Sequence, residues 1–195
     1  MQTYDYIAIG GGSGGVASAR RAAEYGARVL VVEAARLGGT CVNVGCVPKK
    51  VMWYASDIAQ TLREAAGYGF SVSESGFDWS ALKLRRDAYI ARLNEVYANL
   101  LDKAGVDVVR GFAHFIDAQT IEVDGQRFSA PHIVIATGGQ PVVPAIEGAE
   151  LGMDSDGFFA LEHQPRRVAI VGAGYIAVEL AGVLKGLGSE VDMLV

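Results

Sequence analysis

The fold is decided by the stretch YDYIAIGGGSGGVASARRAAEYGARVLVVEA, residues 4–34. Its hydrophobic pattern predicts a β-strand over 5–9, a helix over about 13–25 and a second strand over 29–33. Several glycines separate the first strand from the helix. A strand, a crossover helix and a second strand form a βαβ unit, so the two strands are expected to be parallel neighbours in one sheet.

Three glycines in this stretch indicate a dinucleotide site. Gly10, Gly12 and Gly15 have the spacing G-x-G-x-x-G. The first permits a tight turn, the second lets backbone approach a pyrophosphate, and the third lets the helix pack closely. Glu33 ends the second strand 23 residues after Gly10, where a carboxylate can bind a ribose. A plain glycine turn beside a surface glutamate is the alternative, but the order of strand, turn, helix and acid favours dinucleotide binding.

A near repeat of this unit lies in residues 166–195, RRVAIVGAGYIAVELAGVLKGLGSEVDMLV. It predicts a strand over 168–171, a helix that extends through Leu184, and a strand that begins at Val191. Gly172, Gly174 and Ala177 form the G-x-G-x-x-A variant of the glycine turn, which indicates a second dinucleotide site. The residue that distinguishes NADPH from NADH is expected at or beyond position 195, so this stretch leaves the choice open.

The segment between the two repeats predicts helices over 48–66 and about 79–104, followed by short β-runs with a turn at Asp124 and Gly125. Glycine and proline interrupt the pattern in residues 138–148. We therefore predict an α/β protein of two domains. The first, residues 1–143, is Rossmann-like with a small antiparallel β-meander, and residues 144–195 are the incomplete beginning of a second Rossmann-like domain.

Composition excludes several classes of function. The chain of 195 residues is 51% hydrophobic and contains 25 glycines, which is typical of one or two globular domains. Its net charge of -5 provides no basic surface for nucleic acid. No apolar run approaches the ~18 residues of a membrane helix, and the first residues lack the features of a signal peptide. We expect a cytoplasmic protein without nucleic-acid or membrane partners.

The only two cysteines, Cys41 and Cys46, lie in the segment GGTCVNVGCVPKK, residues 38–50. In a reducing compartment a close pair is more often catalytic, redox-sensing or metal-binding than a lasting structural bridge. On an ideal helix the two Cα atoms would lie ~8.7 Å apart, beyond the ~7 Å that a disulfide permits. A disulfide would therefore need a distorted turn, which Gly45 can provide.

The residues after the pair favour redox chemistry over metal binding. Pro48 suits the first turn of a helix, so Cys46 is expected near the positive end of the helix dipole, which stabilises a thiolate. Lys49 opposes that dipole, which a nearby carboxylate or flavin ring would explain, although by itself the residue is better interpreted as an exposed lysine. No metal site is predicted, because the remaining candidate ligands lack suitable spacing: His114, His132 and His163.

The glycine-rich first site, the cysteine segment, the sequence ATGG at 136–139 and the second glycine-rich site occur in one order. In this respect the chain resembles the N-terminal portion of the flavin disulfide reductases, which are pyridine nucleotide-disulfide oxidoreductases. The similarity to the glutathione reductases among them extends over essentially all 195 residues. Trypanothione reductases carry an acidic residue and a tryptophan where this chain has Ala17 and Arg20. A small and a cationic side chain suit the carboxylates of glutathione.

The resemblance implies FAD in the first domain and NADPH in the second. The implied FAD contacts are Gly10, Gly12, Ser13, Gly14, Gly15, Glu33, Thr40, Cys41, Lys49, Ala113, Thr137 and Gly138. The implied contacts of the nicotinamide nucleotide are Gly172, Ala173, Gly174, Tyr175, Ile176 and Glu179. Tyr175 would cover the flavin until nicotinamide displaces it, and Glu179 would pair with Lys49.

Glutathione disulfide is the implied substrate, with contacts at Ser13, Arg20, Tyr89 and Tyr97. Without the resemblance, Tyr89 and Tyr97 are equally plausible core residues eight positions apart on one helix, and Tyr175 is equally plausible as packing. Leu100, one turn beyond Tyr97, departs from the polar residue expected near the peptide.

The implied catalytic residues are Cys41, Cys46, Lys49 and Glu179. Cys46 would form the thiolate next to the flavin, and Cys41 would attack the substrate. In the family, a histidine and a glutamate near the C-terminus of a partner subunit complete the site. We therefore expect a homodimer and a chain that is part of a longer enzyme. The alternatives are a mercuric or trypanothione reductase and a non-catalytic flavin redox sensor.

Overall fold

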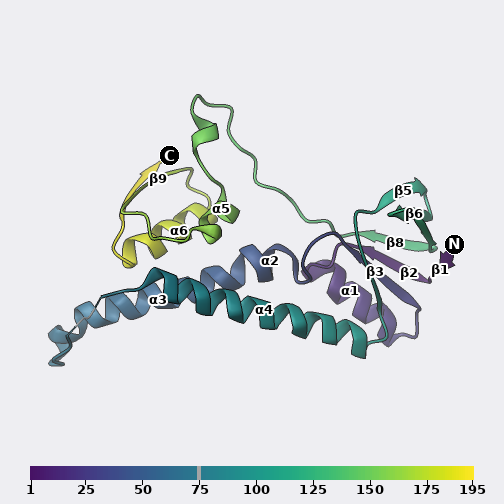
Figure 1. Cartoon of the computed structure of the whole chain (residues 1–195), viewed down its shortest axis with the longest axis horizontal. Coiled ribbons are helices and arrows are strands. Elements are labelled where there is room, and N and C mark those ends of the chain that lie inside the picture. Colours follow the sequence, from purple (N-terminus) through teal and green to yellow (C-terminus); the bar gives the residue numbers. More distant parts are fainter. Residues whose placement is uncertain (74–75) are drawn as a thin grey trace. The chain divides into compact units, whose positions relative to one another are not determined.

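The computed structural model describes residues 1–73 and 76–195. Contacts divide the chain into two compact units: the first comprises Met1–Asn43 and Ile90–Gln140, and the second comprises Val44–Tyr89 and Pro141–Val195. Helix α4 (Trp79–Lys103) contributes its first residues to the second unit and the remainder to the first. Figure 1 labels many of the elements along the chain.

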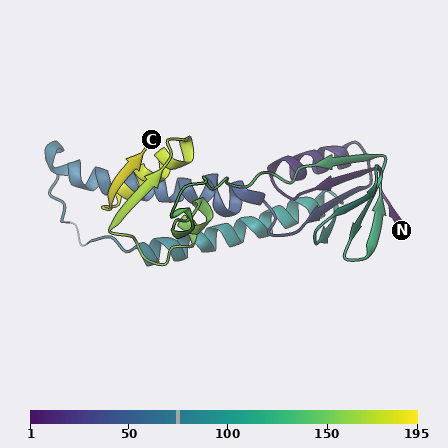
Figure 2. The same cartoon turned by 90° about the horizontal axis from the view of Figure 1, so that it is seen from above.

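A parallel sheet with the strand order β4-β3-β2-β8 forms the centre of the first unit. The predicted βαβ unit is confirmed as β2 (Tyr6–Ile9), α1 (Ser13–Glu24) and β3 (Val29–Glu33). Strand β4 (Asp107–Arg110) pairs with β3, and β8 (His132–Ile135) pairs with β2. Figure 2 shows these strands running side by side. Since all four are parallel, their carboxyl ends share one edge, which is where nucleotides bind in such sheets.

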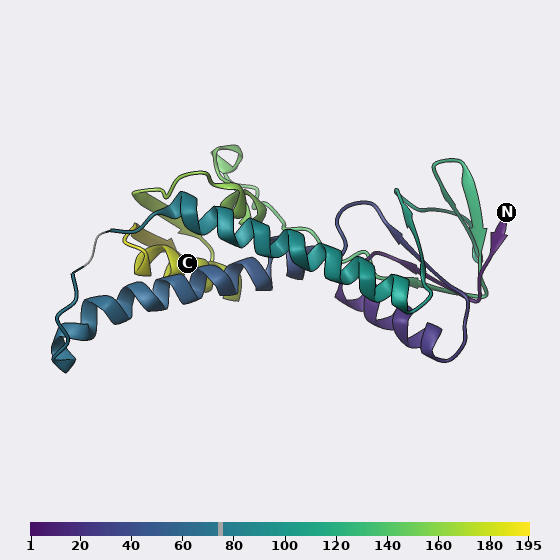
Figure 3. The same ribbon diagram turned by 60° about the horizontal axis from the view of Figure 1, so that its bottom comes forward.

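The two faces of this sheet bury separate apolar cores, because side chains alternate along a strand. One face is covered by α1 and the C-terminal part of α4, with a core of Ala8, Val16, Ala19, Val29, Val31, Leu37, Leu101 and Val106. The other face is covered by the β-meander, with a core of Tyr4, Ile7, Ile9, Leu30, Val32, Ile121, Val123, Phe128 and Ala130. Figure 3 shows the helices on one side of the sheet and the meander on the other.

The predicted antiparallel meander consists of β5 (His114–Asp117), β6 (Thr120–Val123) and β7 (Gln126–Ser129). The predicted turn between β6 and β7 is present, with φ angles of 47° at Asp124 and 77° at Gly125. Two consecutive positive φ angles are typical of a type I′ hairpin turn, which matches the twist of its strands.

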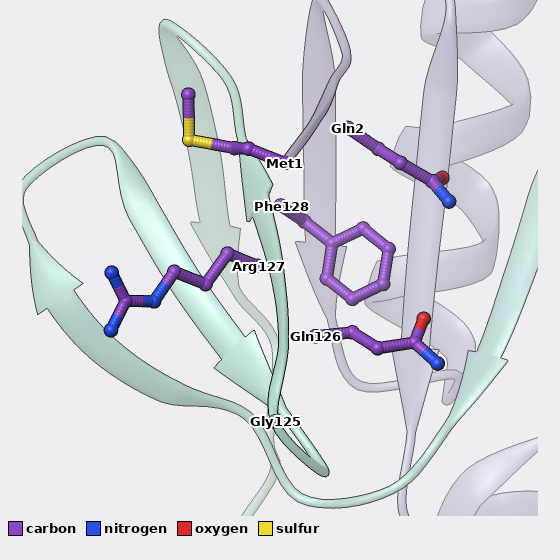
Figure 4. Close-up of a pocket in the computed structure, with 6 residues that line it drawn as sticks. All are labelled: Met1, Gln2, Gly125, Gln126, Arg127 and Phe128. Carbon is purple, nitrogen blue, oxygen red and sulfur yellow. The ribbon is translucent and has the colours of Figure 1, made fainter.

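A short strand that was not predicted, β1 (Gln2–Thr3), pairs in parallel with β7. A hollow of about 330 Å³ lies at this junction and is shown in Figure 4. Its lining consists of Met1, Gln2, Gly125, Gln126, Arg127 and Phe128. None of the predicted site residues lines it.

In the second unit, α3 (Cys46–Glu64) packs against α6 (Tyr175–Gly186). The second predicted βαβ unit is confirmed, because α6 connects the parallel strands β9 (Arg167–Val171) and β10 (Glu190–Leu194). The core contains Met52, Trp79, Phe158, Phe159, Leu180, Val183, Leu184 and Leu187. The remaining elements are the short helices η1 (Ala65–Tyr68), η2 (Ala149–Leu151) and α5 (Ser155–Ala160).

The compact units differ from the predicted domains 1–143 and 144–195, because the segment 44–89 makes its contacts with residues after 140. Compactness within this chain and domain membership are different properties, so the domain boundary stays a prediction. Among the helices of the described residues, none combines the length and the apolar character needed to cross a bilayer.

Candidate functional site

The glycine turn after β2 is packed so closely that two positions have no room for a side chain. A Cβ atom on Gly10 would lie 2.2 Å from the carbonyl oxygen of Ala136, and one on Gly15 would lie 1.8 Å from the carbonyl oxygen of Gly10. Gly10 also has a φ angle of 111°. A Cβ on Gly12, by contrast, would have its nearest neighbour at 3.5 Å, the Cα of Gly39. The bend and the close helix packing therefore require glycine at positions 10 and 15.

The N-terminus of α1 presents backbone donors to solvent. Its N-cap residue, Gly12, provides no side-chain cap, and the first turn contains no acidic residue. Ser13 and Gly14 are exposed. Backbone N–H groups at the positive end of a helix dipole favour an anion. These residues therefore fit the pyrophosphate of a dinucleotide such as FAD.

Glu33 is held beside the glycine turn by two backbone donors. Its Oε2 accepts a hydrogen bond from the N–H of Gly11 at 2.6 Å, and its Oε1 accepts one from the N–H of Ala35 at 2.7 Å. A carboxylate oxygen can accept more than one hydrogen bond. Glu33 therefore has capacity for ribose hydroxyl groups, which is the role predicted for it.

Other implied FAD contacts follow strands of the same sheet. Thr137 and Gly138 come directly after β8 and are exposed. Ala113 follows β4 and is partly buried against the core on the meander side. Since the strands are parallel, these residues share a sheet edge with the glycine turn and Glu33. The implied contact Lys49 belongs to the second unit.

The cysteine segment forms two helices rather than one. Cys41 lies on α2 (Gly39–Val44), which was not predicted, and Cys46 is the first residue of α3. Gly45 separates the helices with φ -145° and ψ -121°, so the predicted irregular turn at this glycine is present. Helix α3 begins two residues before the predicted start at Pro48, which lies within the first turn as expected. Cys41 is half-buried and Cys46 is exposed.

Two asparagines that are not among the predicted site residues support α2. Asn43 is only 8% exposed, and its amide nitrogen donates hydrogen bonds to main-chain oxygens before and within α2. Asn94 of α4 donates to the side-chain oxygen of Asn43 at 2.9 Å. The one available signal in the sequence was the place of Asn43 between the two cysteines, and no local pattern pointed to Asn94.

Lys49 of α3 and Glu179 of α6 form an ion pair, as the resemblance implied. The Lys49 side chain is 15% exposed, and its Nζ lies 5.3 Å from the ring centroid of Tyr175. Helix packing brings these residues together, and Ser56 Oγ donates to the carbonyl of Gly182 at 3.4 Å farther along the same interface. Lys49 therefore has the carboxylate neighbour predicted for it, while its contact with a flavin stays a prediction.

The second glycine turn resembles the first at its helix terminus. Gly172 has a φ angle of 113°, and Gly174 is the N-cap of α6 without a side-chain cap. No acidic residue lies in the first turn of α6. Ala173, Tyr175 and Ile176 are exposed. The turn therefore fits the phosphates of a second nucleotide.

The predicted substrate residues are divided between the units. Ser13, Arg20 and Tyr97 belong to the first unit, and Tyr89 to the second. Arg20 is half-buried on α1 and makes no hydrogen bond or ion pair within residues 1–73 and 76–195. Tyr97 packs partly against the helix-side core, whereas Tyr89 is 47% exposed. A half-buried guanidinium with unused donors suits an anionic ligand.

The chain matches the family model described as "Pyridine nucleotide-disulphide oxidoreductase" over residues 4–195. It is 56% identical to a "Glutathione reductase" of Yarrowia lipolytica, in an alignment of 97% of this chain and 43% of the relative. For those of Schizosaccharomyces pombe and Debaryomyces hansenii the identities are 55% and 49%, over 100% of this chain and 44% and 46% of each relative. The chain thus spans less than half the length of these relatives.

Proposed function

The chain belongs to the pyridine nucleotide-disulphide oxidoreductase family, and from this premise we propose that the protein carrying it reduces glutathione disulfide to glutathione, with NADPH as reductant and FAD as cofactor. One observation carries the proposal. The cysteine helix α2 follows directly on a turn that is bonded to the phosphate-binding glycines, where the N–H of Gly38 donates to the carbonyl of Gly11 at 2.8 Å. The helix that carries Cys41 is therefore attached to the glycine turn at residues 10–15, which we call the nucleotide cradle because the nucleotide would bind there.

Specific residues would hold the cofactor. The N-terminus of α1 would bind the FAD pyrophosphate, and Glu33 a ribose. When bound, FAD supplies the two-electron transfer from NADPH to the Cys41–Cys46 disulfide. Lys49, fixed by Glu179, would place a positive charge next to the cofactor. Gly174 and the N-terminus of α6 would bind NADPH.

The two thiols would then carry out thiol–disulfide exchange. The Cys41 thiolate attacks one sulfur of glutathione disulfide, a mixed disulfide forms, and one glutathione leaves. The Cys46 thiolate attacks the Cys41 sulfur, the second glutathione leaves, and the Cys41–Cys46 disulfide forms again. Each cysteine thiol loses its proton when it forms the thiolate, and each departing glutathione thiolate takes up one proton, so the two protons of the dithiol end on the two glutathione molecules. Cys46 is suited to the resolving role because it begins α3, where the helix dipole stabilises a thiolate.

Arg20 supports glutathione as the substrate. It lies on α1 with no acceptor among the described residues, and Ala17, one turn earlier, is small and exposed. A glutathione carboxylate can accept charge-assisted hydrogen bonds from the guanidinium. An acidic residue at position 17 would repel that carboxylate. The 49% to 56% identity to proteins named glutathione reductase supports the same substrate.

The test is a steady-state assay with the purified, FAD-loaded protein. NADPH absorbance is followed with glutathione disulfide, trypanothione disulfide or mercuric ion as oxidant, and with NADH in place of NADPH. Sustained turnover that is fastest with NADPH and glutathione disulfide is expected. A single oxidation without turnover would contradict the proposal and favour a redox sensor, and preference for either other oxidant would favour a related reductase. In the same assay, Arg20→Ala should weaken the use of glutathione disulfide. Arg21→Ala is its matched control, because Arg21 is exposed and pairs with Glu24.

A homodimer in the cytoplasm is part of this proposal. The support for the homodimer is the resemblance to dimeric enzymes in which the partner subunit contributes the acid–base pair. Sedimentation of the purified protein and fractionation of cells test these two points separately.

A further inference from the structure

Helix α2 is too short to be stable by itself. It comprises six residues, Gly39–Val44, and isolated helices below ~12 residues are marginal in water. Its inward side chains are Val42, which is 2% exposed, and Asn43, which is 8% exposed. Thr40 is exposed and Cys41 half-buried. The contacts of Val42 and Asn43 therefore help to hold the helix that carries the Cys41 thiol.

The amide of Asn43 joins α2 to the preceding turn. Its Nδ2 donates to the carbonyl of Gly39 at 2.9 Å and to that of Leu37 at 3.1 Å, with a longer contact to Arg36 at 3.4 Å. Aspartate or a hydrophobic residue could not donate to these oxygens. Since the group is buried, losing these bonds leaves main-chain acceptors unsatisfied.

Asn94 completes this arrangement from α4, 51 residues later in the chain. Its Nδ2 donates to the carbonyl of Leu37 at 2.8 Å and to Oδ1 of Asn43 at 2.9 Å. The two amides thus form a continuous, mostly part-buried network between α4, the turn at 37–39 and α2. A network that joins three segments in this way favours one arrangement of them.

The same turn is attached to the phosphate-binding glycines. The N–H of Gly38 donates to the carbonyl of Gly11 at 2.8 Å, and a Cβ on Gly39 would lie 2.7 Å from the Cα of Gly12. The backbones at Gly12 and Gly39 are therefore in close contact. The Asn43–Asn94 network therefore ties α2 to a turn that itself contacts the glycine turn at residues 10–15.

We propose that Asn43 and Asn94 are positioning residues for thiol–disulfide exchange, which hold Cys41 at a fixed place relative to the nucleotide cradle. The inference rests on the proposed function for the identity of the substrate, but the positioning of Cys41 is a property of this chain.

The kinetic test uses Asn94→Ala in the FAD-loaded protein, with Asn99→Ala as the control, because Asn99 is exposed on the same helix and makes no hydrogen bond within the described residues. NADPH oxidation is measured with glutathione disulfide and, separately, with ferricyanide, which takes electrons without the cysteines. Asn94→Ala is expected to lower kcat with glutathione disulfide about tenfold, which is the factor that corresponds to the free energy of a lost intramolecular hydrogen bond. The rate with ferricyanide is expected to stay unchanged. Equal losses with both oxidants, or no loss with either, would overturn the inference.

A second measurement does not depend on the substrate. Iodoacetamide alkylation of Cys41 and amide hydrogen exchange of residues 39–44 are followed by mass spectrometry in the reduced protein. Asn94→Ala is expected to accelerate both about tenfold, because α2 opens more often, while Asn99→Ala resembles the wild type. Asn43→Ala should have the larger effect if it folds. Unchanged exchange and alkylation in Asn94→Ala would overturn the inference, whereas a wild-type protein inactive with glutathione disulfide would refute only the proposed function.

Discussion

The substitution Gly10→Ala places one methyl group where the structure already has backbone. Its Cβ would lie 2.2 Å from the carbonyl oxygen of Ala136, 2.7 Å from the Ala136 carbonyl carbon and 3.2 Å from the nitrogen of Thr137. None of these atoms can rotate away as a side chain could. The N–H of Ala136 is also bonded to the carbonyl of Ile9 at 2.8 Å, so relief would require β8 and β2 to separate locally.

Two costs add at this position. A positive φ angle, here 111°, costs a residue with a Cβ about 1–2 kcal/mol. The overlap with fixed backbone adds about 1–3 kcal/mol. The sum of roughly 2–5 kcal/mol is a large part of the ~5–15 kcal/mol that stabilises a typical domain. Gly26→Ala isolates the first cost, because Gly26 has a φ angle of 86° and a Cβ there would have no neighbour within 4 Å.

The assay is urea denaturation followed by circular dichroism, together with FAD titration by flavin fluorescence. Gly10→Ala is expected to be less stable than Gly26→Ala by about 1–3 kcal/mol, the overlap cost alone. It should also bind FAD at least about tenfold more weakly, because the turn that presents the α1 N-terminus is displaced. Failure of Gly10→Ala to fold beside a folded Gly26→Ala agrees with this reasoning. Equal stability and equal FAD affinity of the two variants would refute it.

Three further predictions concern the thiols, the substrate and the pH dependence. In the reduced FAD-loaded protein, Cys46→Ser should abolish the long-wavelength charge-transfer absorbance and Cys41→Ser should keep it, and the opposite spectra would exchange the two roles. Arg20→Ala should lower kcat/KM for glutathione disulfide by a factor that corresponds to about 1.5–3 kcal/mol, the contribution of one charged hydrogen bond, and should leave NADPH oxidation by an artificial acceptor unchanged. Equal losses of activity with glutathione disulfide and with the artificial acceptor would argue against substrate binding by Arg20. Burial raises the pKa of Asp87, but hydrogen bonds from a neighbouring arginine and lysine outweigh it and hold that pKa below its usual range. Asp87 therefore stabilises the fold above its unfolded pKa of about 3.9 and loses this contribution as the pH falls through its lower folded pKa. Asp87→Asn should reduce stability at pH 7 and flatten the acid side of a thermal denaturation series, and an unchanged acid slope would contradict the assignment.

Patterns of neighbouring residues predicted most of the regular structure. The helix over 13–24 and the strands over 6–9 and 29–33 follow from periodicity over a few residues and from the glycines between them. The hairpin turn at Asp124 and Gly125 follows from the tolerance of these residue types for positive φ. Helix α2 was missed, because glycines and β-branched residues have low helix propensity and because part of its support comes from Asn94 of another helix.

Some residues of the candidate site could likewise be assigned from local sequence patterns, and others could not. Gly10, Gly15 and Glu33 could be assigned from spacing, since their roles depend on a single βαβ unit. The pairing of Lys49 with Glu179 could be expected only from resemblance to a family, because 130 residues separate the two. No local pattern indicates which of many carboxylates a lysine will meet.

The sequence by itself determined where the glycine turns, the cysteine pair and the two βαβ units lie, because each is encoded in residues that are close along the chain. The tertiary structure alone decided that Asn94 reaches Asn43 and that β4 and β8 flank the central strands on opposite sides. It also decided that the carbonyl of Ala136 closes the space at Gly10. These features depend on which distant segments pack together, and that is set by burial of the whole apolar surface rather than by any short stretch of sequence.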